Sequence, residues 1–147
     1  MRDIGLSEDQ RRFALSQRRG VLATARPNGA PRVVPICFAI DAYAIVSVID
    51  DKPKAGADPH RLGRVRDIAV HPDVSVLVDR WDEDWTRLAW LRIDGVARLV
   101  EPGEQGHERA VAALRERYAA YRPMKLDRAP VISVRPIRVV AWGDLRV

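Results

Sequence analysis

Residues 20–49 read GVLATARPNGAPRVVPICFAIDAYAIVSVI, and this stretch decides the fold class. Its apolar runs are rich in β-branched residues, and they are interrupted at Pro27-Asn28-Gly29 and at Asp41-Ala42. Both interruptions are typical of turns between strands. The pattern therefore predicts an antiparallel meander of three strands, over residues 21–25, 32–40 and 43–49.

Three helices are predicted around these strands. Ser7 and Gln10 have the spacing of a capping box, which predicts a helix from residue 8 to about residue 18. Apolar residues at helical spacing predict a second helix over residues 61–70 and a third over residues 104–121. The third helix has an apolar stripe of four residues, Val111, Leu114, Tyr118 and Tyr121.

Five more strands complete the expected architecture, over residues 74–78, 86–94, 96–100, 131–134 and 139–142, with the second and third meeting at Asp94-Gly95. Because the connections are short and the strands mostly sequential, we expect a mainly β, antiparallel barrel with peripheral helices. The length fits one domain over residues 1–147.

Two of the expected strands are apolar on both alternating faces, in residues 33–38 and 88–93. A single barrel wall should leave one face in water, so something covers the second face. A homodimer is the economical explanation, and the helices of the same chain are the alternative.

The composition predicts a folded, cytoplasmic protein, with 47% hydrophobic and 31% charged residues. Cys37 is the single cysteine, so an intramolecular disulfide is impossible, which suits a reducing compartment. The longest apolar run, residues 33–40, is broken by Pro35 and is too short to cross a bilayer. Charged side chains within residues 1–20 argue against a signal peptide, and we expect no membrane association.

The common catalytic signatures do not occur in the sequence. No Gly-x-Gly-x-x-Gly follows a strand, and no Gly-Lys-Ser/Thr phosphate loop is present. His60, His71 and His107 lie at spacings that match no compact metal site, so we expect surface or capping roles for them and no bound metal. Cys37 lies in an apolar strand, where a thiol acts as a small hydrophobic group. We therefore identify no catalytic side chain from the sequence.

A basic span carries more information. The formal net charge is +5, which raises the question of a nucleic-acid partner. However, five cations gather within a short stretch: Lys52, Lys54, Arg61, Arg64 and Arg66. A nucleic-acid groove should interleave basic and aromatic residues, whereas a compact cluster can hold one phosphate. We therefore expect no nucleic acid, and a solvated helix face is the alternative to a phosphate site.

Three tryptophans lie within ten residues: Trp81 and Trp85 flank the acidic residues 82–84, and Trp90 follows them. A tryptophan on a loop between strands could cover a planar heterocycle or fill a subunit interface, and packing in the core is the alternative.

The motifs together resemble those of pyridoxamine-5′-phosphate-oxidase-like proteins. The resemblance lies in Gly20-Val21-Leu22-Ala23-Thr24, in Pro27-Asn28-Gly29-Ala30-Pro31 with Val34-Pro35, and in His71-Pro72 followed by residues 74–79. Residues 50–54, 82–85 and 92–98 are similar to the actinobacterial branch of deazaflavin (coenzyme F420)-dependent oxidoreductases.

This resemblance implies a homodimeric split β-barrel with two cofactor sites at the subunit interface. It implies that the phosphate of FMN or coenzyme F420 binds Lys52, Lys54, Arg61, Arg64 and Arg66. It also implies that the cofactor ring lies against Val34, Pro35, Ser47 and Val48, with Trp85 coming from the partner subunit. The chain departs from the family pattern in one helix, where many relatives carry a Lys and an Asn-Leu in place of Arg64 and Asp67-Ile68. Arginine can replace lysine on a phosphate, but an acid at Asp67 would not favour a nearby anion unless it orients an arginine.

In such proteins the cofactor carries the redox chemistry, which fits the lack of an acid/base motif. The leading functional prediction is an oxidoreductase that uses coenzyme F420 for hydride transfer to or from a small organic substrate. The alternatives are an FMN-dependent oxidase or reductase and a non-catalytic carrier of the cofactor.

Overall fold

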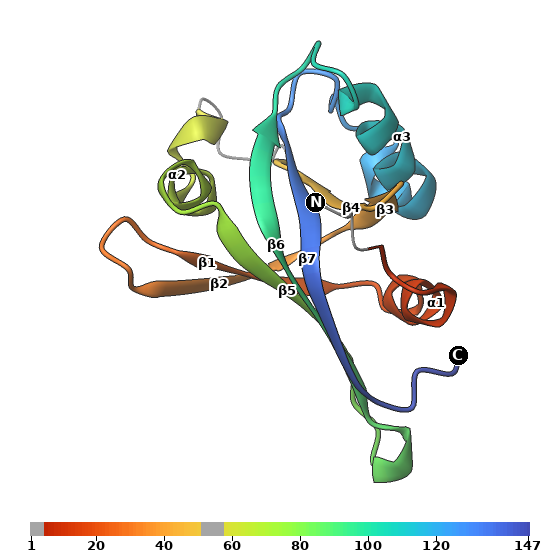
Figure 1. The fold of residues 1–147 in the computed structure, drawn as a ribbon. Helices are drawn as coiled ribbons and strands as arrows, with labels where there is room; N and C mark the ends of the chain where they lie inside the picture. The colour runs from red at the N-terminus through yellow and green to blue at the C-terminus, as the bar shows by residue number, and fades with distance from the viewer. Residues whose placement is uncertain (1–4, 51–57) are drawn as a thin grey trace.

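The computed structural model describes residues 5–50 and 58–147, which form one curled antiparallel sheet with three α-helices around it (Figure 1). The sheet has seven strands in the order β2-β1-β5-β6-β7-β4-β3. The strands are β1 Gly20–Ala25, β2 Pro31–Ile36, β3 Ala39–Asp41, β4 Ala44–Val48, β5 Asp73–Arg80, β6 Ala89–Val100 and β7 Val131–Gly143. The helices are α1 Glu8–Ser16, α2 Gly63–Val70 and α3 His107–Arg117. The predicted mainly β, antiparallel fold class is confirmed, and the curled sheet is consistent with a split barrel.

The capping box at the first helix forms as predicted. The Ser7 hydroxyl accepts the Gln10 backbone N–H at 3.1 Å, and the Ser7 backbone N–H donates to the Gln10 side chain at 2.9 Å. These two bonds satisfy free N–H groups of the first turn, so α1 begins where the sequence indicates.

The two edges of the sheet are joined by two residues, Cys37 and Phe38, which lie between β2 and β3. The Phe38 N–H donates to the Tyr118 hydroxyl at 3.0 Å, and the Phe38 carbonyl accepts from Arg117 Nε at 2.8 Å. Side chains after α3 and at its end therefore replace a neighbouring strand at this point, and the chain leaves one edge of the sheet for the other. The predicted three-strand meander is wrong for this reason: β1 pairs with β2 and β3 with β4, but β2 does not pair with β3 or β4.

A bulge stands where the sequence predicted a break between two strands. Strand β6 runs through Asp94 and Gly95 with a register shift against β7, and Gly95 lies opposite Pro136. A Cβ atom on Gly95 would lie 2.5 Å from the Arg135 carbonyl oxygen, so glycine allows the two backbones to approach. The same bulge accommodates Pro136, and the two strands expected at the end of the chain are the single strand β7.

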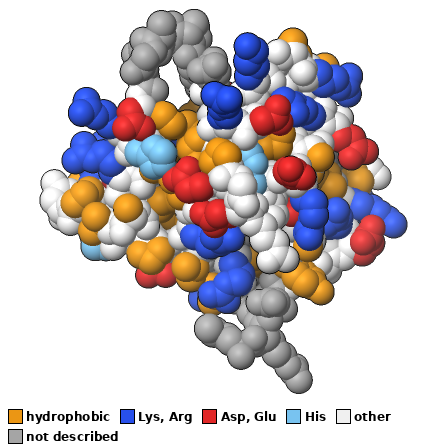
Figure 2. Space-filling model, turned by 90° about the horizontal axis from the view of Figure 1, so that it is seen from above, with side chains coloured by type: hydrophobic (Ala, Val, Ile, Leu, Met, Phe, Trp, Pro, Cys, Tyr) orange, Lys and Arg blue, Asp and Glu red, His pale blue; other side chains and the backbone are white. Residues whose placement is uncertain are grey.

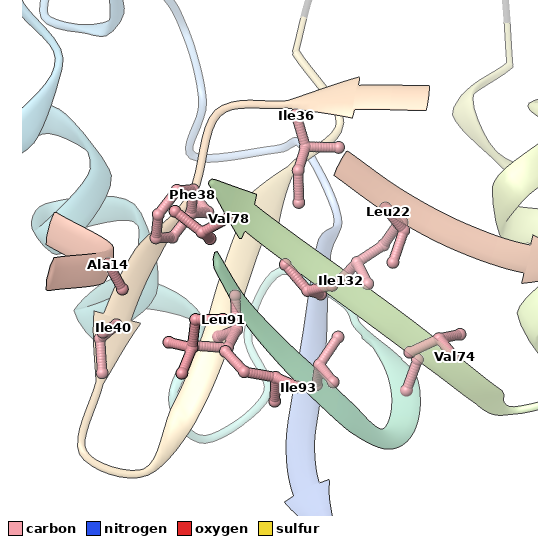
Figure 3. Packing of buried hydrophobic residues seen from close by; sticks show 14 of the residues in the cluster. Ala14, Leu22, Ile36, Phe38, Ile40, Val74, Val78, Leu91, Ile93 and Ile132 are labelled. Atoms are coloured by element: carbon pink, nitrogen blue, oxygen red, sulfur yellow. The ribbon is translucent and has the colours of Figure 1, made fainter. Parts of the chain in front are cut away.

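The hydrophobic core lies in two clusters. The larger one fills the inside of the curled sheet, and Figure 3 shows Leu22, Phe38 and Leu91 converging there. The smaller one lies under α3 and contains the whole predicted stripe, Val111, Leu114, Tyr118 and Tyr121. The stripe prediction is confirmed.

The outer face of the sheet keeps large apolar side chains in solvent. Along β5, Val76 and Val78 are buried while Leu77 between them is exposed. Val33 on β2 and Trp142 on β7 are 68% and 52% exposed. In the described part of the chain no helix covers these side chains, so the homodimer stays a prediction. None of the described helices has the length and apolar character needed to span a membrane.

Candidate functional site

Three of the five basic residues predicted to hold a phosphate, Arg61, Arg64 and Arg66, lie in or just before helix α2. Lys52 and Lys54 lie outside the described residues. Arg61 ends a 3-10 turn before the helix and is exposed. Arg64 and Arg66 are two residues apart, which places them about 200° apart around an α-helix, so they project to different sides. Arg64 and Arg66 therefore do not share one face of α2, and the phosphate contacts of the five residues stay predictions.

Arg64 is half-buried. Its Nε atom is buried and has no hydrogen-bond partner among residues 5–50 and 58–147. Burial lowers the pKa of Arg64, while the nearby Asp50 and Tyr121 oppose this shift. Tyr121 in turn donates a 3.3 Å hydrogen bond to Asp50 Oδ2. A half-buried arginine with an unused Nε donor is suited to an anionic ligand at the start of α2.

On another side of α2, a buried carboxylate joins the helix to the β1–β2 hairpin. Asp67 is 1% exposed, and its Oδ2 accepts from Thr24 Oγ1 at 2.6 Å and from Arg32 Nε at 2.7 Å. Burial raises the pKa of Asp67, but the bonds from Thr24 and Arg32 outweigh it, so the pKa lies below its usual range. Asp67 therefore orients an arginine, which is the condition under which an acid is compatible with an anion site.

A cavity of about 270 Å³ opens beside this network, between α2 and the hairpin turn. It is lined by Arg26, Pro27, Asn28, Arg32, Gly63, Arg66 and Asp67. We call it the hairpin pocket. The sequence analysis identified Arg66 but missed Arg26 and Arg32. The available signal was their position on either side of the turn, since the pairing of Thr24 with Arg32 and of Ala25 with Pro31 brings them together.

The residues predicted to line the cofactor ring fall into two groups. Val34 is partly buried and Pro35 exposed, and both lie on the edge strand β2. Ser47 and Val48 on β4 are 5% and 2% exposed, and Val48 packs in the cluster under α3. Only the β2 pair therefore reaches the surface of one chain, and the ring contacts of all four residues stay predictions.

Trp85 lies at the tip of the β5–β6 hairpin, which extends away from the body of the molecule (Figure 1). Trp85 and Trp81 are 70% and 67% exposed, so neither is a core residue of the single chain. Trp90 is partly buried and faces Trp142 across the β6–β7 pair. The exposed tip is available to a second molecule, as the partner role of Trp85 requires.

The three histidines have different surroundings. The ring of His60 lies between Glu101 Oε1 at 2.6 Å and Asp58 Oδ1 at 3.0 Å, and His71 caps the end of α2. His107 is 2% exposed with Nε2 at 2.6 Å from the Ala129 carbonyl, so the expected surface or capping role is wrong for it. Within the described ranges, no three His, Cys, Asp or Glu side chains gather as a metal site would require.

Comparison with known proteins decides the family. Residues 6–143 match the family described as pyridoxamine 5′-phosphate oxidase. The chain belongs to this family. None of the curated proteins matches the sequence.

Three solved structures show how widely the fold is used. A conserved hypothetical protein from Mycobacterium tuberculosis has a TM-score of 0.76 at 22% identity, over 99% of this chain and 89% of that one. The heme storage protein HutZ from Vibrio cholerae has a TM-score of 0.70 at 18% identity, over 95% of both chains. A FAD-binding protein from Mesorhizobium loti has a TM-score of 0.64 at 22% identity, over 92% and 94%. At such identities these likenesses show the fold, which serves both flavin- and heme-binding proteins.

The charges on the surface are mixed. Figure 2 shows Lys and Arg side chains interspersed with Asp and Glu side chains across the face that it presents. Several of the cations are paired, for example Arg98 with Glu104 and Arg109 with Asp41.

Proposed function

We propose that this protein is an oxidoreductase that binds coenzyme F420 and uses it for hydride transfer to or from a small organic substrate. FMN is the alternative cofactor in the same site. Membership of the pyridoxamine 5′-phosphate oxidase family supports a flavin-type cofactor. The resemblance of residues 50–54, 82–85 and 92–98 to the deazaflavin branch favours F420 over FMN.

The observation that carries the proposal is Arg64. Its Nε donor is buried without a partner among the described residues, at the first turn of α2. A phosphate monoester would supply the missing acceptor and the negative charge, and the free N–H groups of the helix start favour the same charge. Arg61, Lys52 and Lys54 are nearby in the sequence and would complete the phosphate site.

The cofactor, when bound, supplies the hydride chemistry. The protein would hold the phosphate through Arg64 and position the ring along the edge strand β2, beside Val34 and Pro35. A second copy of the chain would cover the exposed outer face of the sheet and bring Trp85 to the site. These contacts orient the ring and exclude water from it.

A cofactor titration of the purified protein tests the proposal. F420, FMN and heme are titrated separately, followed by absorbance and by tryptophan fluorescence, and oligomeric state is measured by sedimentation. We expect tight binding of F420 to a dimer and quenching of fluorescence, and we expect Trp85→Ala to weaken binding without dissociating the dimer. FMN binding in preference to F420 would select the alternative cofactor, and binding of heme alone would refute the proposal.

The phosphate contact is tested with Arg64→Gln, and Arg128→Gln serves as a matched control because Arg128 is exposed. A charge-assisted contact contributes about 1.5–3 kcal/mol, so Arg64→Gln should weaken cofactor binding about ten- to a hundredfold. Binding of the phosphate-free ring should change much less. Cofactor binding without turnover across a panel of unsaturated substrates would make the protein a carrier and not an oxidoreductase.

A further inference from the structure

We propose that the hairpin pocket is a second anion-binding site, separate from Arg64, and that its ligand is a phosphoryl group carrying two negative charges. The site does not depend on the proposed cofactor. Arg66 lines the hairpin pocket and Arg64 does not. The two side chains project from different sides of α2.

The charge of the pocket calls for an anion. Arg26, Arg32 and Arg66 bring three positive charges from three elements, and Asp67 brings one negative charge. Arg26 and Arg66 form no ion pair and no side-chain hydrogen bond within residues 5–50 and 58–147. The positive charges around the pocket exceed the negative charge by two, which matches the charge of a phosphate dianion.

The third guanidinium is fixed in place before any ligand arrives. Arg32 donates to Asp67 through Nε, and Thr24 holds the same carboxylate oxygen. The Nη1 and Nη2 atoms of Arg32 lie over Gly63, where an added Cβ would be 2.5 and 2.8 Å from them. The absence of a side chain at Gly63 lets the guanidinium lie against the start of α2. An arginine held this way loses little freedom on binding, which favours affinity.

The turn of the hairpin supplies a neutral donor. Asn28 Oδ1 accepts the Ala30 backbone N–H at 3.0 Å, so the oxygen of this side chain is engaged within the turn. Asn28 also lines the pocket, and the Nδ2 group of its side chain is a donor that the turn does not use. The cavity of about 270 Å³ is larger than a phosphate ion alone, so it also accommodates part of the organic group that bears the phosphate.

Two kinds of ligand share this chemistry, free phosphate and the phosphoryl group of a larger metabolite. The experiment measures binding of inorganic phosphate, pyrophosphate and adenosine 5′-phosphate by calorimetry and by thermal shift, at constant ionic strength set with sodium chloride. We expect saturable binding that chloride does not reproduce. Tighter binding of adenosine 5′-phosphate than of phosphate identifies the metabolite, and equal binding identifies the free ion.

Two substitutions locate the site. Arg32→Gln should weaken phosphate binding about ten- to a hundredfold, because it removes one charge-assisted contact. Gly63→Ala should have a similar effect by displacing the Arg32 guanidinium, while alanine keeps or improves the helical propensity of α2. Gly63→Ala therefore keeps the test decisive even where Arg32→Gln impairs folding.

Controls separate this site from the cofactor site. Arg128→Gln should leave phosphate binding unchanged. Arg64→Gln should weaken F420 or FMN and any phosphate bound at the cofactor site, while the phosphate bound in the hairpin pocket stays. Phosphate binding that is unchanged in both Arg32→Gln and Gly63→Ala would overturn the proposal, even if the cofactor binds as expected. Tight binding of duplex DNA that falls steeply with salt and is lost in Arg32→Gln would assign these arginines to a polymer backbone, and would also overturn it.

Discussion

Replacing Tyr118 with phenylalanine removes one oxygen atom at the junction between the two edges of the sheet. The Tyr118 hydroxyl accepts the backbone N–H of Phe38 at 3.0 Å and lies 2.9 Å from the Arg18 carbonyl, to which it can donate its proton. Phe38 is fully buried, so water cannot replace the lost acceptor in the variant. The hydrogen bond from Arg117 to the Phe38 carbonyl remains, so the Phe38 N–H is the backbone group that loses its partner.

The magnitude follows from this unsatisfied donor. A buried N–H group without a partner costs about 1–3 kcal/mol, and the Arg18 carbonyl is near solvent and adds little. We therefore expect Tyr118→Phe to lower the free energy of unfolding by about 2 kcal/mol. With a urea m-value of about 2 kcal/mol/M, the midpoint should fall by about 1 M.

Tyr121→Phe is a matched control, since the two rings pack edge to face with centroids 5.6 Å apart. Tyr121→Phe removes a long hydrogen bond to Asp50, 3.3 Å in length, and leaves no backbone N–H without its acceptor among the described residues, so its cost should be about 0.5 kcal/mol. Urea unfolding of both variants at one protein concentration gives the comparison. Equal losses, or a loss below 0.5 kcal/mol for Tyr118→Phe, would refute the explanation of the junction given above.

Two further predictions concern single contacts. The hydrogen bond that His60 donates to Glu101, followed by that to Asp58, raises the pKa of His60, so NMR titration of Glu101→Gln should show this pKa falling back toward 6.5. Because the folded pKa is raised, the stabilising effect of this contact is full below about pH 6.5 and is lost as the pH rises through the folded pKa. Gly95→Ala places a Cβ 2.5 Å from the Arg135 carbonyl oxygen and should cost about 3 kcal/mol in thermal unfolding, and an unchanged melting temperature would show that the bulge relaxes freely.

Local signals in the sequence predicted most helices and strands. The capping box at Ser7 and the apolar stripe from Val111 to Tyr121 are properties of neighbouring residues, and both form as predicted, although α3 ends at Arg117 and not at residue 121. The strand from residue 32 to residue 40 was predicted as one element because Cys37 and Phe38 continue its apolar run. Its interruption depends on Tyr118, 80 positions away, and no local pattern reveals that contact.

Asp94-Gly95 shows a different limit. An Asp-Gly pair between two apolar runs is typical of a tight turn, but a β-bulge with a glycine gives the same sequence pattern. The choice depends on whether the partner strand continues past the glycine. Here β7 does continue, with Pro136 placed opposite Gly95, and the sequence of β6 carries no information about it.

The candidate site was predicted in part for the same reason. The charge pattern identified the basic residues around α2, but not which of them share a pocket. Arg64 and Arg66 separate because of helical geometry, which the sequence already contains. Arg32 reaches the helix of Arg66 through its contact with Asp67, which spans 35 positions in the sequence, so the hairpin pocket was missed.

Asp67 also determines how the hairpin pocket should respond to pH. Because its folded pKa is lowered, its stabilising bonds to Thr24 and Arg32 are full above about pH 4 and are lost as the pH falls through the folded pKa. Arg32 is therefore held in place over the pH range in which proteins are usually handled.

A phosphate monoester, in contrast, loses its second charge near pH 6. Phosphate binding should thus weaken as the pH falls from 7 to 5, without loss of folded protein, because the ligand titrates and the pocket does not. Calorimetry at pH 7 and pH 5 measures this, and sulfate, which stays a dianion over the range, is the control. Equal weakening of sulfate and phosphate would mean that a group of the protein titrates, and that the role assigned to Asp67 is wrong.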